Sequence, residues 1–316
     1  MPSITGGLSP HVVLCNGIPN NLNYIGGKAR ILDQLLPVFP EHISTFVDLF
    51  CGGCNVGINT NAENYIYNDG NSELIGLLKM FLRLNTTTIL KRLDEIVEHY
   101  GFSKTKDHNF AYYGGNPMIG VSRYNKEPFL RLRQDYNNSP RNNQHYIMLY
   151  ALVVFGFNNQ MRFNERGEYN LPVGKRDFND VIRRKLEVFV DKLKAQHPLI
   201  QNKDFRRFNI DQLDNQSLVY LDPPYLISTA TYNEGGGWTE RDERDLLRFM
   251  DELNAHGIKF VLSNMLEHKG RKNQLLIDWI EQRNLQVVGV NMDYSNSNYQ
   301  VEGKDSGTVE VLVKNY

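Results

Sequence analysis

The sequence predicts an α/β fold in which one parallel-type sheet is interrupted by an inserted segment. Three observations lead to this fold class. Residues 46–69 have the order strand, glycine turn, helix, strand and acid, which opens a nucleotide-binding βαβ unit. Residues 85–180 differ in texture, with charged helical stretches and an asparagine-rich loop. From about residue 181 strands and helices alternate again, so the sheet is expected to resume there.

The opening unit is read from apolar runs and their endings. Residues 46–50 form a short apolar run that enters a Cys-Gly-Gly-Cys turn at 51–54, and residues 65–67 form a second strand that ends at Asn68 and Asp69. Asn71 or Ser72 then caps a helix, because apolar residues follow at helical spacing. These are Leu74, Leu77, Leu78, Phe81 and Leu82.

The sequence pattern of the inserted segment predicts two helices and a hairpin. Residues 86–100 form an amphipathic helix closed by Gly101, and 145–155 form an apolar helix. Between them lie a charged stretch, 123–141, and an asparagine-rich loop, 137–144. Residues 157–176 predict a β-hairpin around a turn at 165–167, because apolar side chains alternate on both arms. The alternating residues are Met161, Phe163, Tyr169, Leu171 and Val173.

The C-terminal part returns to the α/β pattern. Expected strands cover 218–221, 258–262, 285–290 and 308–313, and expected helices cover 181–195, 240–254 and 273–281. Residues 205–210 are also strand-like. Ser263 and Asn264 are expected to end their strand at the same sheet edge as Asp222. The predicted boundaries are therefore an arm at 1–22, one discontinuous domain at 23–84 and 181–316, and an inserted domain at 85–180.

Bulk composition excludes several classes of protein. A net charge of −1 and a pI of about 6.7 do not suit a protein that coats nucleic acid by overall charge. Three cysteines give no disulfide framework and favour a reducing compartment. The first 20 residues lack the pattern of a signal peptide, and no apolar run approaches the ~18 residues of a membrane span. We expect a cytoplasmic protein with no membrane partner.

The strongest chemical signal is Asp222-Pro223-Pro224-Tyr225, directly after a predicted strand. A carboxylate and a neighbouring backbone carbonyl can accept both hydrogens of an adenine amino group, which turns its lone pair toward an electrophile. The two prolines fix the backbone, and Tyr225 offers a flat face for a base taken out of the stack. The alternative is an ordinary strand-end turn with an aromatic plug. Because ligands gather at the carboxyl edge of open sheets, we favour the catalytic interpretation.

These residues resemble the Dam-like DNA adenine-N6 methyltransferase family, whose catalytic motif is Asp-Pro-Pro-Tyr. Four further segments resemble the family's motifs in the same order: 24–28, 46–53, 68–73 and the recognition hairpin 162–174. The resemblance implies a Rossmann-like S-adenosylmethionine (AdoMet) sheet with an inserted helical and β-hairpin DNA-recognition domain. It implies transfer of the AdoMet methyl group to adenine in double-stranded DNA, without a metal. A cognate restriction endonuclease encoded alongside is left open, and GATC is the target suggested by the hairpin.

The resemblance places seven residues at the cofactor. Asp69 would bind the ribose hydroxyls, although it could instead cap the following helix. Lys28 would reach the methionine carboxylate, and its alternative is a solvated lysine. Asp48 would attract the sulfonium or amino group, and its alternative is a capped turn carboxylate. The remaining cofactor residues are Tyr24, Phe50, Gly52 and Asp211, where Gln212 replaces the family's usual aromatic neighbour.

Basic and amide side chains cluster in the hairpin, where base-edge and phosphate contacts would lie. The alternative is a solvated charged face. After Gly174 the sequence Lys175-Arg176-Asp177 departs from the family's basic-then-aromatic pattern, which leaves the recognised bases open. The predicted DNA-binding residues are Asn159, Arg162, Asn164, Arg166, Pro172, Lys175 and Arg176.

Other interpretations stay open. Cys51 and Cys54 have the spacing of a redox pair, but a redox domain would leave the acidic and Asp-Pro-Pro-Tyr motifs unexplained. Two cysteines without a second pair do not make a zinc site. The glycine-rich loop 232–238 is either a lid or a disordered loop. An AdoMet enzyme acting on RNA or on a protein amide, and a non-catalytic DNA-binding relic, are the remaining alternatives.

Overall fold

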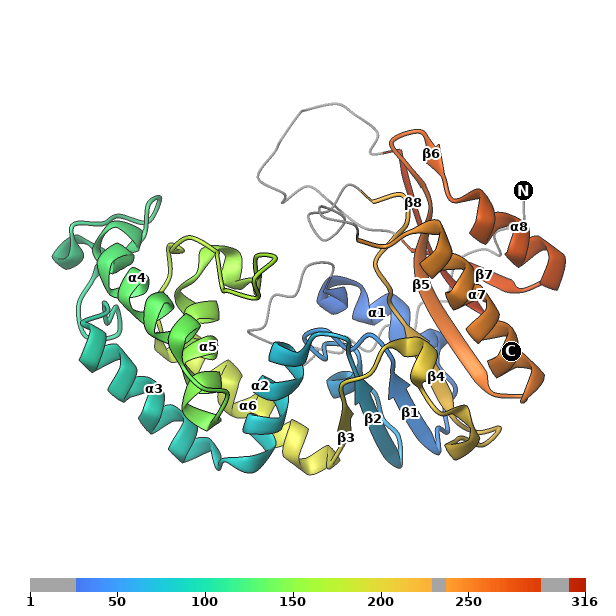
Figure 1. Ribbon diagram of the computed structural model, residues 1–316, viewed down its shortest axis with the longest axis horizontal. Helices are drawn as coiled ribbons and strands as arrows, with labels where there is room; N and C mark the ends of the chain where they lie inside the picture. The colour runs from blue at the N-terminus through green and yellow to red at the C-terminus, as the bar shows by residue number, and fades with distance from the viewer. Residues whose placement is uncertain (1–26, 229–236, 291–306) are drawn as a thin grey trace.

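The computed structural model describes residues 27–228, 237–290 and 307–316. Tyr24, the predicted arm 1–22 and most of the loop 232–238 lie outside these ranges. The described chain forms a twisted sheet with helices on both faces, joined to a helical lobe at one side (Figure 1). The α/β class and the split sheet predicted from the sequence are confirmed.

The central sheet has the order β3-β2-β1-β4-β5-β8-β7. Neighbours from β3 to β5 are parallel, and β8 runs antiparallel to both β5 and β7. The prediction of a parallel-type sheet is therefore wrong at β8. The strands are β1 (Thr45–Asp48), β2 (Asn64–Asn68), β3 (Leu199–Gln201), β4 (Leu218–Leu221), β5 (Lys259–His268), β7 (Gln286–Val290) and β8 (Thr308–Lys314), with β6 (Arg271–Lys272) pairing the end of β5.

Strand β5 is longer than its apolar run predicts. Its pairing with β8 continues from Val261 to His268, so Ser263 and Asn264 lie inside the strand and do not end it. The cause is non-local, because antiparallel pairing with the last strand satisfies backbone groups that the shorter β4 cannot reach. The expectation that the strand ends at residues 263–264 is thus wrong.

Alternate residues of the strands enter two cores. Phe46, Tyr67 and Tyr220 pack with helices on one face, whereas Val47 and Val219 pack with helices on the other. The first face is covered by α2 (Ser72–Arg83), α6 (Asp180–Gln196) and the short α1 (Leu32–Leu35). The second face is covered by α7 (Glu240–Ala255) and α8 (Gln274–Arg283). This two-sided covering explains why the central strands are apolar throughout.

The helical lobe is built around α5 (Asn143–Phe155), whose residues from 147 to 155 are all buried. It is surrounded by α2, α3 (Thr86–Tyr100) and α4 (Ser122–Asn138), and an all-round apolar helix is stable only in such a position. The charged stretch 123–141 is thus mostly helix. The predicted loop 137–144 is shorter, because the Asn142 side chain accepts from the His145 N–H and caps α5.

The hairpin at 157–176 is present, but isolated bridges hold it instead of regular strands. Phe163 pairs with Tyr169, and Gly156 pairs with Val173. The turn is organised by Asn164, whose side-chain oxygen accepts from the N–H groups of Arg166 and Glu168. Tyr169 is buried, and its hydroxyl donates to the carbonyl of Leu152 at the end of α5. The hairpin is therefore fixed to the helical lobe by its inward-facing side chains.

Residues 205–210, predicted as strand-like, form parts of two 3₁₀ turns, at Phe205–Arg207 and Ile210–Gln212. The cause is local capping, because the side chains of Asp204 and Asn209 accept from the N–H two residues on. The sheet edge is taken instead by β3. In the described part of the chain, no helix has the length and apolarity to cross a membrane.

Candidate active site

Three motifs meet because they follow three neighbouring parallel strands. Strand β1 ends at Asp48, β2 is followed by Asp69, and β4 is followed by Asp222. Since β1 pairs with both β2 and β4 in parallel, their carboxyl ends lie at one edge of the sheet. This is the edge at which open α/β sheets bind ligands.

A pocket opens at this edge. Of the predicted residues, Lys28, Asp48, Phe50, Gly52, Asp69, Asp222, Pro223, Pro224 and Tyr225 line it, together with Cys51, Asn55 and Tyr220 among others. Asp211 is exposed and does not line it. The predicted catalytic and cofactor motifs are therefore brought to one cavity, with Asp211 outside it.

Asp69 connects the glycine turn after β1 with the loop that follows β2. Its Oδ2 accepts from the Gly52 N–H at 3.0 Å, and its Oδ1 accepts from the Asn71 N–H at 2.8 Å. Burial raises the pKa of this carboxyl, and the two N–H donors oppose the rise. Asn71, and not Asp69, caps helix α2. The carboxylate thus tightens the glycine turn while it faces the pocket.

Asp48 is 2% exposed and accepts from the Gly57 N–H at 3.2 Å. Burial raises its pKa to about 8, and the nearby Asp222 carboxylate adds to the rise. A pocket that holds three acids beside one lysine favours a cationic ligand, because such a ligand relieves their mutual repulsion.

The glycine turn contains two cysteines that are free and buried. Burial raises the pKa of both thiols, which disfavours the thiolate that redox chemistry needs. Cys54 has a φ of 58°, a left-handed conformation in which a glycine would be relaxed. Gly52, with a φ of 45°, meets the same requirement without strain. The left-handed conformation of the turn thus lets the Gly52 N–H approach the Asp69 carboxylate.

Asp222 is held through one of its two oxygens. Lys28 Nζ lies 2.8 Å from Asp222 Oδ1, and the Tyr225 hydroxyl donates to the same Oδ1 at 3.1 Å. The Asp222 side chain is 19% exposed, whereas that of Lys28 is 2% exposed. Neither contact involves Oδ2, which leaves this oxygen as the acceptor available to a ligand.

Each partner of the pair stabilises the charged form of the other. Burial alone would lower the pKa of Lys28, but the Asp222 carboxylate outweighs it and the pKa is raised. Burial raises the pKa of Asp222, and Lys28 opposes this rise. The lysine also lies 5.1 Å from the centre of the Tyr225 ring. Lys28 therefore contacts two residues of the Asp-Pro-Pro-Tyr motif, which the sequence did not reveal.

Two further residues of the site were missed. Tyr220, on β4, is buried, and within the described residues its hydroxyl has no hydrogen-bond partner. Ser263, on β5, lies 3.2 Å from the Tyr225 hydroxyl. A signal for Tyr220 is present in the sequence, because it lies on the strand two residues before Asp222, and alternate positions along an extended chain point to the same face. For Ser263 the sequence predicts a strand end at this sheet edge and a structural support of the site, without a contact to Tyr225.

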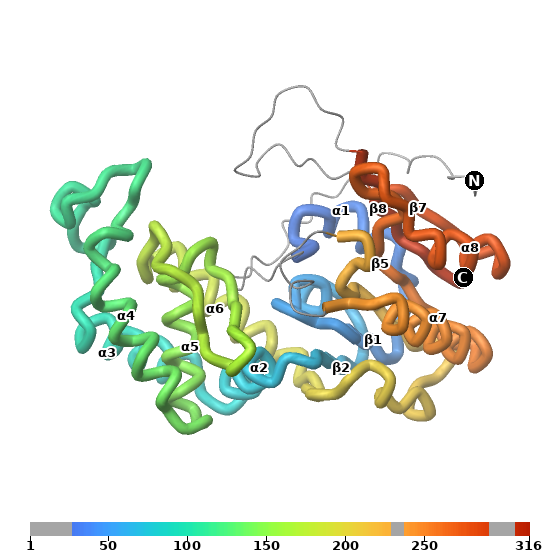
Figure 2. Tube along the Cα trace, turned by 45° about the horizontal axis from the view of Figure 1, so that its top comes forward, coloured from blue at the N-terminus to red at the C-terminus, as the bar shows by residue number. Residues whose placement is uncertain are grey.

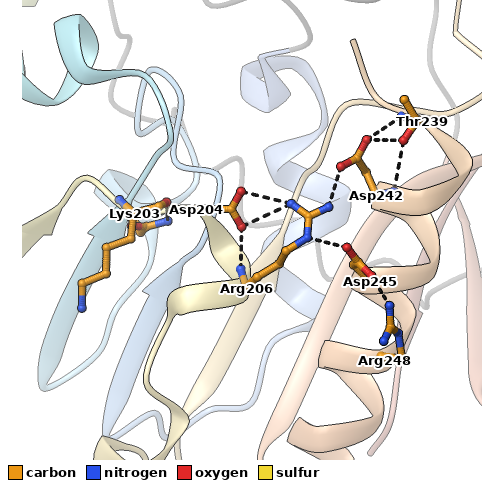
Figure 3. Close-up of polar contacts among 8 residues, drawn as sticks. Lys203, Asp204, Arg206, Thr239, Asp242, Asp245 and Arg248 are labelled. Carbon is orange, nitrogen blue, oxygen red and sulfur yellow. Dashed lines mark hydrogen bonds and ion pairs between the residues drawn. The ribbon is translucent and has the colours of Figure 1, made fainter. Parts of the chain in front are cut away.

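An aromatic wall adjoins the pocket at Phe50. Its ring centre lies 5.5 Å from that of Phe205 and 5.9 Å from that of Trp238. Arg206 fixes this wall, because it binds Asp204 on its own loop and Asp242 and Asp245 on α7 (Figure 3). The turn after β3 thereby packs against Phe50 at the rim of the pocket.

The predicted DNA-binding residues lie on the hairpin and divide into two groups. Arg162, Arg166, Pro172, Lys175 and Arg176 are exposed. The amides of the other two are engaged locally. Asn159 donates to the carbonyls of Val153 and Val154, and Asn164 holds the turn.

Several basic residues of the stretch 123–141, which precedes the hairpin, also bond to backbone carbonyls or to a carboxylate of the protein itself. Arg131 donates to the carbonyl of Tyr100, and Arg133 donates to that of Leu171. Arg141 pairs with Glu73. No cluster of three metal-binding side chains occurs within residues 27–228, 237–290 and 307–316.

Comparison with known proteins places this geometry in a family. The D12 class N6 adenine-specific DNA methyltransferase family matches residues 24–293. Modification methylase StsI of Streptococcus sanguinis is 40% identical over 305 residues, and the type II methyltransferase M.FokI of Planomicrobium okeanokoites is 37% identical over 305 residues. Each match covers 95% of this chain and 43% of the relative, so the chain spans less than half of their length.

A shorter relative matches along most of both proteins. The DNA adenine methylase of Escherichia coli K12 is 25% identical over 280 residues, which cover 87% of this chain and 89% of that protein. The family implies AdoMet as methyl donor and DNA as substrate. The resemblance inferred from the motifs is confirmed, and the chain belongs to the D12 class N6 adenine-specific DNA methyltransferase family.

Proposed function

We propose that this chain transfers the methyl group of AdoMet to N6 of adenine at a specific sequence in double-stranded DNA, with the target base flipped into the pocket. The observation that carries the proposal is the asymmetric anchoring of Asp222. Lys28 and Tyr225 hold Oδ1, and Oδ2 stays available beside the pocket that contains Asp48 and Asp69.

The lining of the pocket fits AdoMet. Three acids and one lysine suit a ligand with a sulfonium, an ammonium and one carboxylate. The unpartnered Tyr220 hydroxyl supplies a further polar group. In this proposal Asp69 holds the ribose hydroxyls, Asp48 faces the positive charge, Gly52 admits the ligand to the backbone, and Phe50 packs on it. The roles of Tyr24, Asp211 and Lys28 at the cofactor stay predictions.

The chain's own residues then prepare the nucleophile. When bound, AdoMet supplies a methyl group on a sulfonium that is already a good leaving group, so no metal is required. Asp222 Oδ2 accepts a hydrogen bond from N6 and turns its lone pair out of the ring. Pro223 and Pro224 fix the backbone, and Tyr225 packs against the base. The bound AdoMet would release its methyl group with the C–S electron pair left on sulfur, and the proton that N6 loses as the N–C bond forms would pass to solvent water. Flipping costs a few kcal/mol, which stacking and hydrogen bonds offset.

The hairpin is proposed to read the sequence through Arg162, Arg166, Pro172, Lys175 and Arg176, with Asn159 and Asn164 supporting it. We propose a cytoplasmic enzyme, and we extend the pairing with a restriction endonuclease to this chain because two relatives are named as type II or modification methylases. GATC stays a hypothesis for the target.

The deciding experiment is single-molecule sequencing of host DNA with and without expression of the chain. We expect N6-methyladenine at one short sequence in the expressing cells only. An Asp222→Ala chain expressed to the same level should leave that sequence unmethylated. Host DNA without new N6-methyladenine, from cells in which the folded chain is present, would refute the proposed function.

A further inference from the structure

An exposed surface of aromatic and aliphatic side chains lies on the loop between α3 and α4 and on the first turn of α4, far from the pocket in the sequence. Eleven large hydrophobic side chains are exposed in the described residues, and five of them lie within 110–124. Tyr112 is 67% exposed and Met118 is 78% exposed. We call this set the tip surface: Phe110, Tyr112, Met118, Ile119 and Tyr124. An exposed apolar cluster of this kind marks an interaction site.

The loop that carries the tip surface is held in place by specific contacts. The buried Asp177 carboxylate accepts from the Thr105 N–H at 2.6 Å and from the Thr105 hydroxyl at 2.7 Å. His108 stacks on Tyr112 with ring centres 4.0 Å apart, and Tyr113 packs against Tyr124 at 4.7 Å. The aromatic side chains are therefore presented by a fixed backbone and do not belong to a loose connection.

The charge around the tip surface is positive. Residues 98–127 and 175–177 contain six lysines and arginines against four acids, one of which, Asp177, is buried beneath the loop, in a chain whose net charge is −1. One of the acids, Glu98, pairs with Lys104. The basic residues are Lys104, Lys106, Arg123, Lys126, Lys175 and Arg176. Aromatic groups among basic side chains suit a polyanion that also has apolar surface.

The tip surface continues directly from the recognition hairpin. The Val121 N–H donates to the carbonyl of Lys175 at 3.1 Å. A Cβ on Gly120 would lie 2.0 Å from that carbonyl oxygen, so the close approach requires glycine there. The loop lies at the end of the helical lobe away from the sheet (Figures 1 and 2).

We propose that the tip surface binds the duplex that flanks the target sequence on one side. Its basic residues contact phosphates, and Tyr112 and Met118 pack on sugars and base edges in a groove. This inference rests on the proposed function, because the hairpin fixes which side of the target the tip reaches. It predicts a DNA footprint that extends beyond the recognised sequence in one direction only.

The test uses the full chain and duplexes that carry the sequence found by methylation mapping. The flank is lengthened in steps on one side, then on the other, and the dissociation constant is measured by fluorescence anisotropy. Wild-type affinity should rise several-fold when one particular flank reaches the tip. A Tyr112→Ala, Met118→Ala double variant should lose that gain but bind the shortest duplex like the wild type. Leu199→Ala, which removes an exposed side chain on edge strand β3, is the matched control.

Two further measurements keep the proposal open to refutation. Lys106→Gln with Lys126→Gln should flatten the salt dependence of binding on the long-flank duplex only. Iodouracil placed along that flank should photo-crosslink to Tyr112. If the wild-type enzyme is active but its affinity does not depend on flank length, this inference alone is overturned. If the wild type is inactive, the proposed function is overturned. A change in oligomeric state in the double variant would show that a second copy occupies the surface instead.

Discussion

Asp222 presents two oxygens in different surroundings, and its chemistry depends on that difference. Oδ1 is bonded to Lys28 and Tyr225, and Oδ2 has neither contact. We expect Asp222→Asn to lower the single-turnover rate of methyl transfer by about 10²–10³-fold, with DNA and AdoMet affinity changed little, because the lost interaction strengthens toward the transition state. Tritiated AdoMet measures the rate and gel shifts measure binding. A fast Asp222→Asn enzyme would move the catalytic centre elsewhere.

Two roles are possible for Lys28, and they predict changes in different quantities: the pH dependence of the rate or the affinity for AdoMet. If it acts through Asp222, Lys28→Met should raise the pKa of that carboxyl further, so the fall in rate on lowering the pH should begin at a higher pH than in the wild type. AdoMet affinity should change little. Rates across the pH range and calorimetric titration measure both quantities, with Lys28→Arg as the variant that keeps the charge. A loss of AdoMet affinity with an unchanged pH profile would support the methionine carboxylate contact instead.

Asp48 should couple AdoMet binding to proton release. Its pKa is about 8, so it is largely protonated at pH 6.5, and a cationic ligand binds best to the ionised form. AdoMet affinity should therefore weaken as pH falls below about 8. Calorimetry at pH 6.5 in buffers of different ionisation enthalpy should show release of close to one proton. Asp48→Asn should abolish the release, and equal release from both proteins would remove Asp48 from this role.

The hairpin 157–176 separates exposed side chains from side chains that hold its own turn. Arg162 is exposed and donates to the Asn170 side chain across the hairpin, whereas Asn164 is used inside the turn. We expect Arg162→Ala to relax discrimination at one base pair by roughly 1–3 kcal/mol. Methylation of all single-base variants of the target measures this. Asn164→Ala should instead lower the methylation of all of these target variants by a similar factor. Unchanged preferences in Arg162→Ala would leave the hairpin as a phosphate clamp.

Among the described residues, the sheet and the helical lobe share the larger hydrophobic core and are also joined by a polar cluster around Glu73. The larger core contains residues of the sheet, α2, α5 and α6, so packing crosses the predicted boundary between residues 84 and 85. Glu73 on α2 is bonded to Tyr136, Arg141 and His145 of the inserted segment. The division into catalytic and recognition domains stays a prediction, and we expect the two parts to unfold together.

Glu73 should make that joint stability pH-dependent. Burial would raise its pKa, but hydrogen bonds from His145, Arg141 and Tyr136 hold it at about 2. The contribution is therefore complete above about pH 4.5 and is lost as pH falls toward 2. Glu73→Gln should lower the free energy of unfolding at neutral pH by about 1.5–3 kcal/mol and remove this acid dependence. Denaturant unfolding at several pH values tests this, and two separate transitions would contradict the shared core.

The sequence by itself determined the fold class, the hairpin, and the motifs that meet at the sheet edge. These features depend on local signals: apolar periodicity, caps such as Asn71, and the rule that parallel strands align their carboxyl ends. The exposed arginine at 162 follows from the same hairpin pattern.

Only the tertiary structure decided which side chains meet. Lys28 and Asp222 pair across 194 positions, β8 reverses its direction, and Glu73 bonds to three residues of the inserted segment. Asn159 and Asn164 hold the hairpin itself, although their side-chain amides suggested contacts with bases. The physical reason is that periodicity gives the buried face of each element, whereas a hydrogen bond or ion pair depends on the packing of elements distant in the chain.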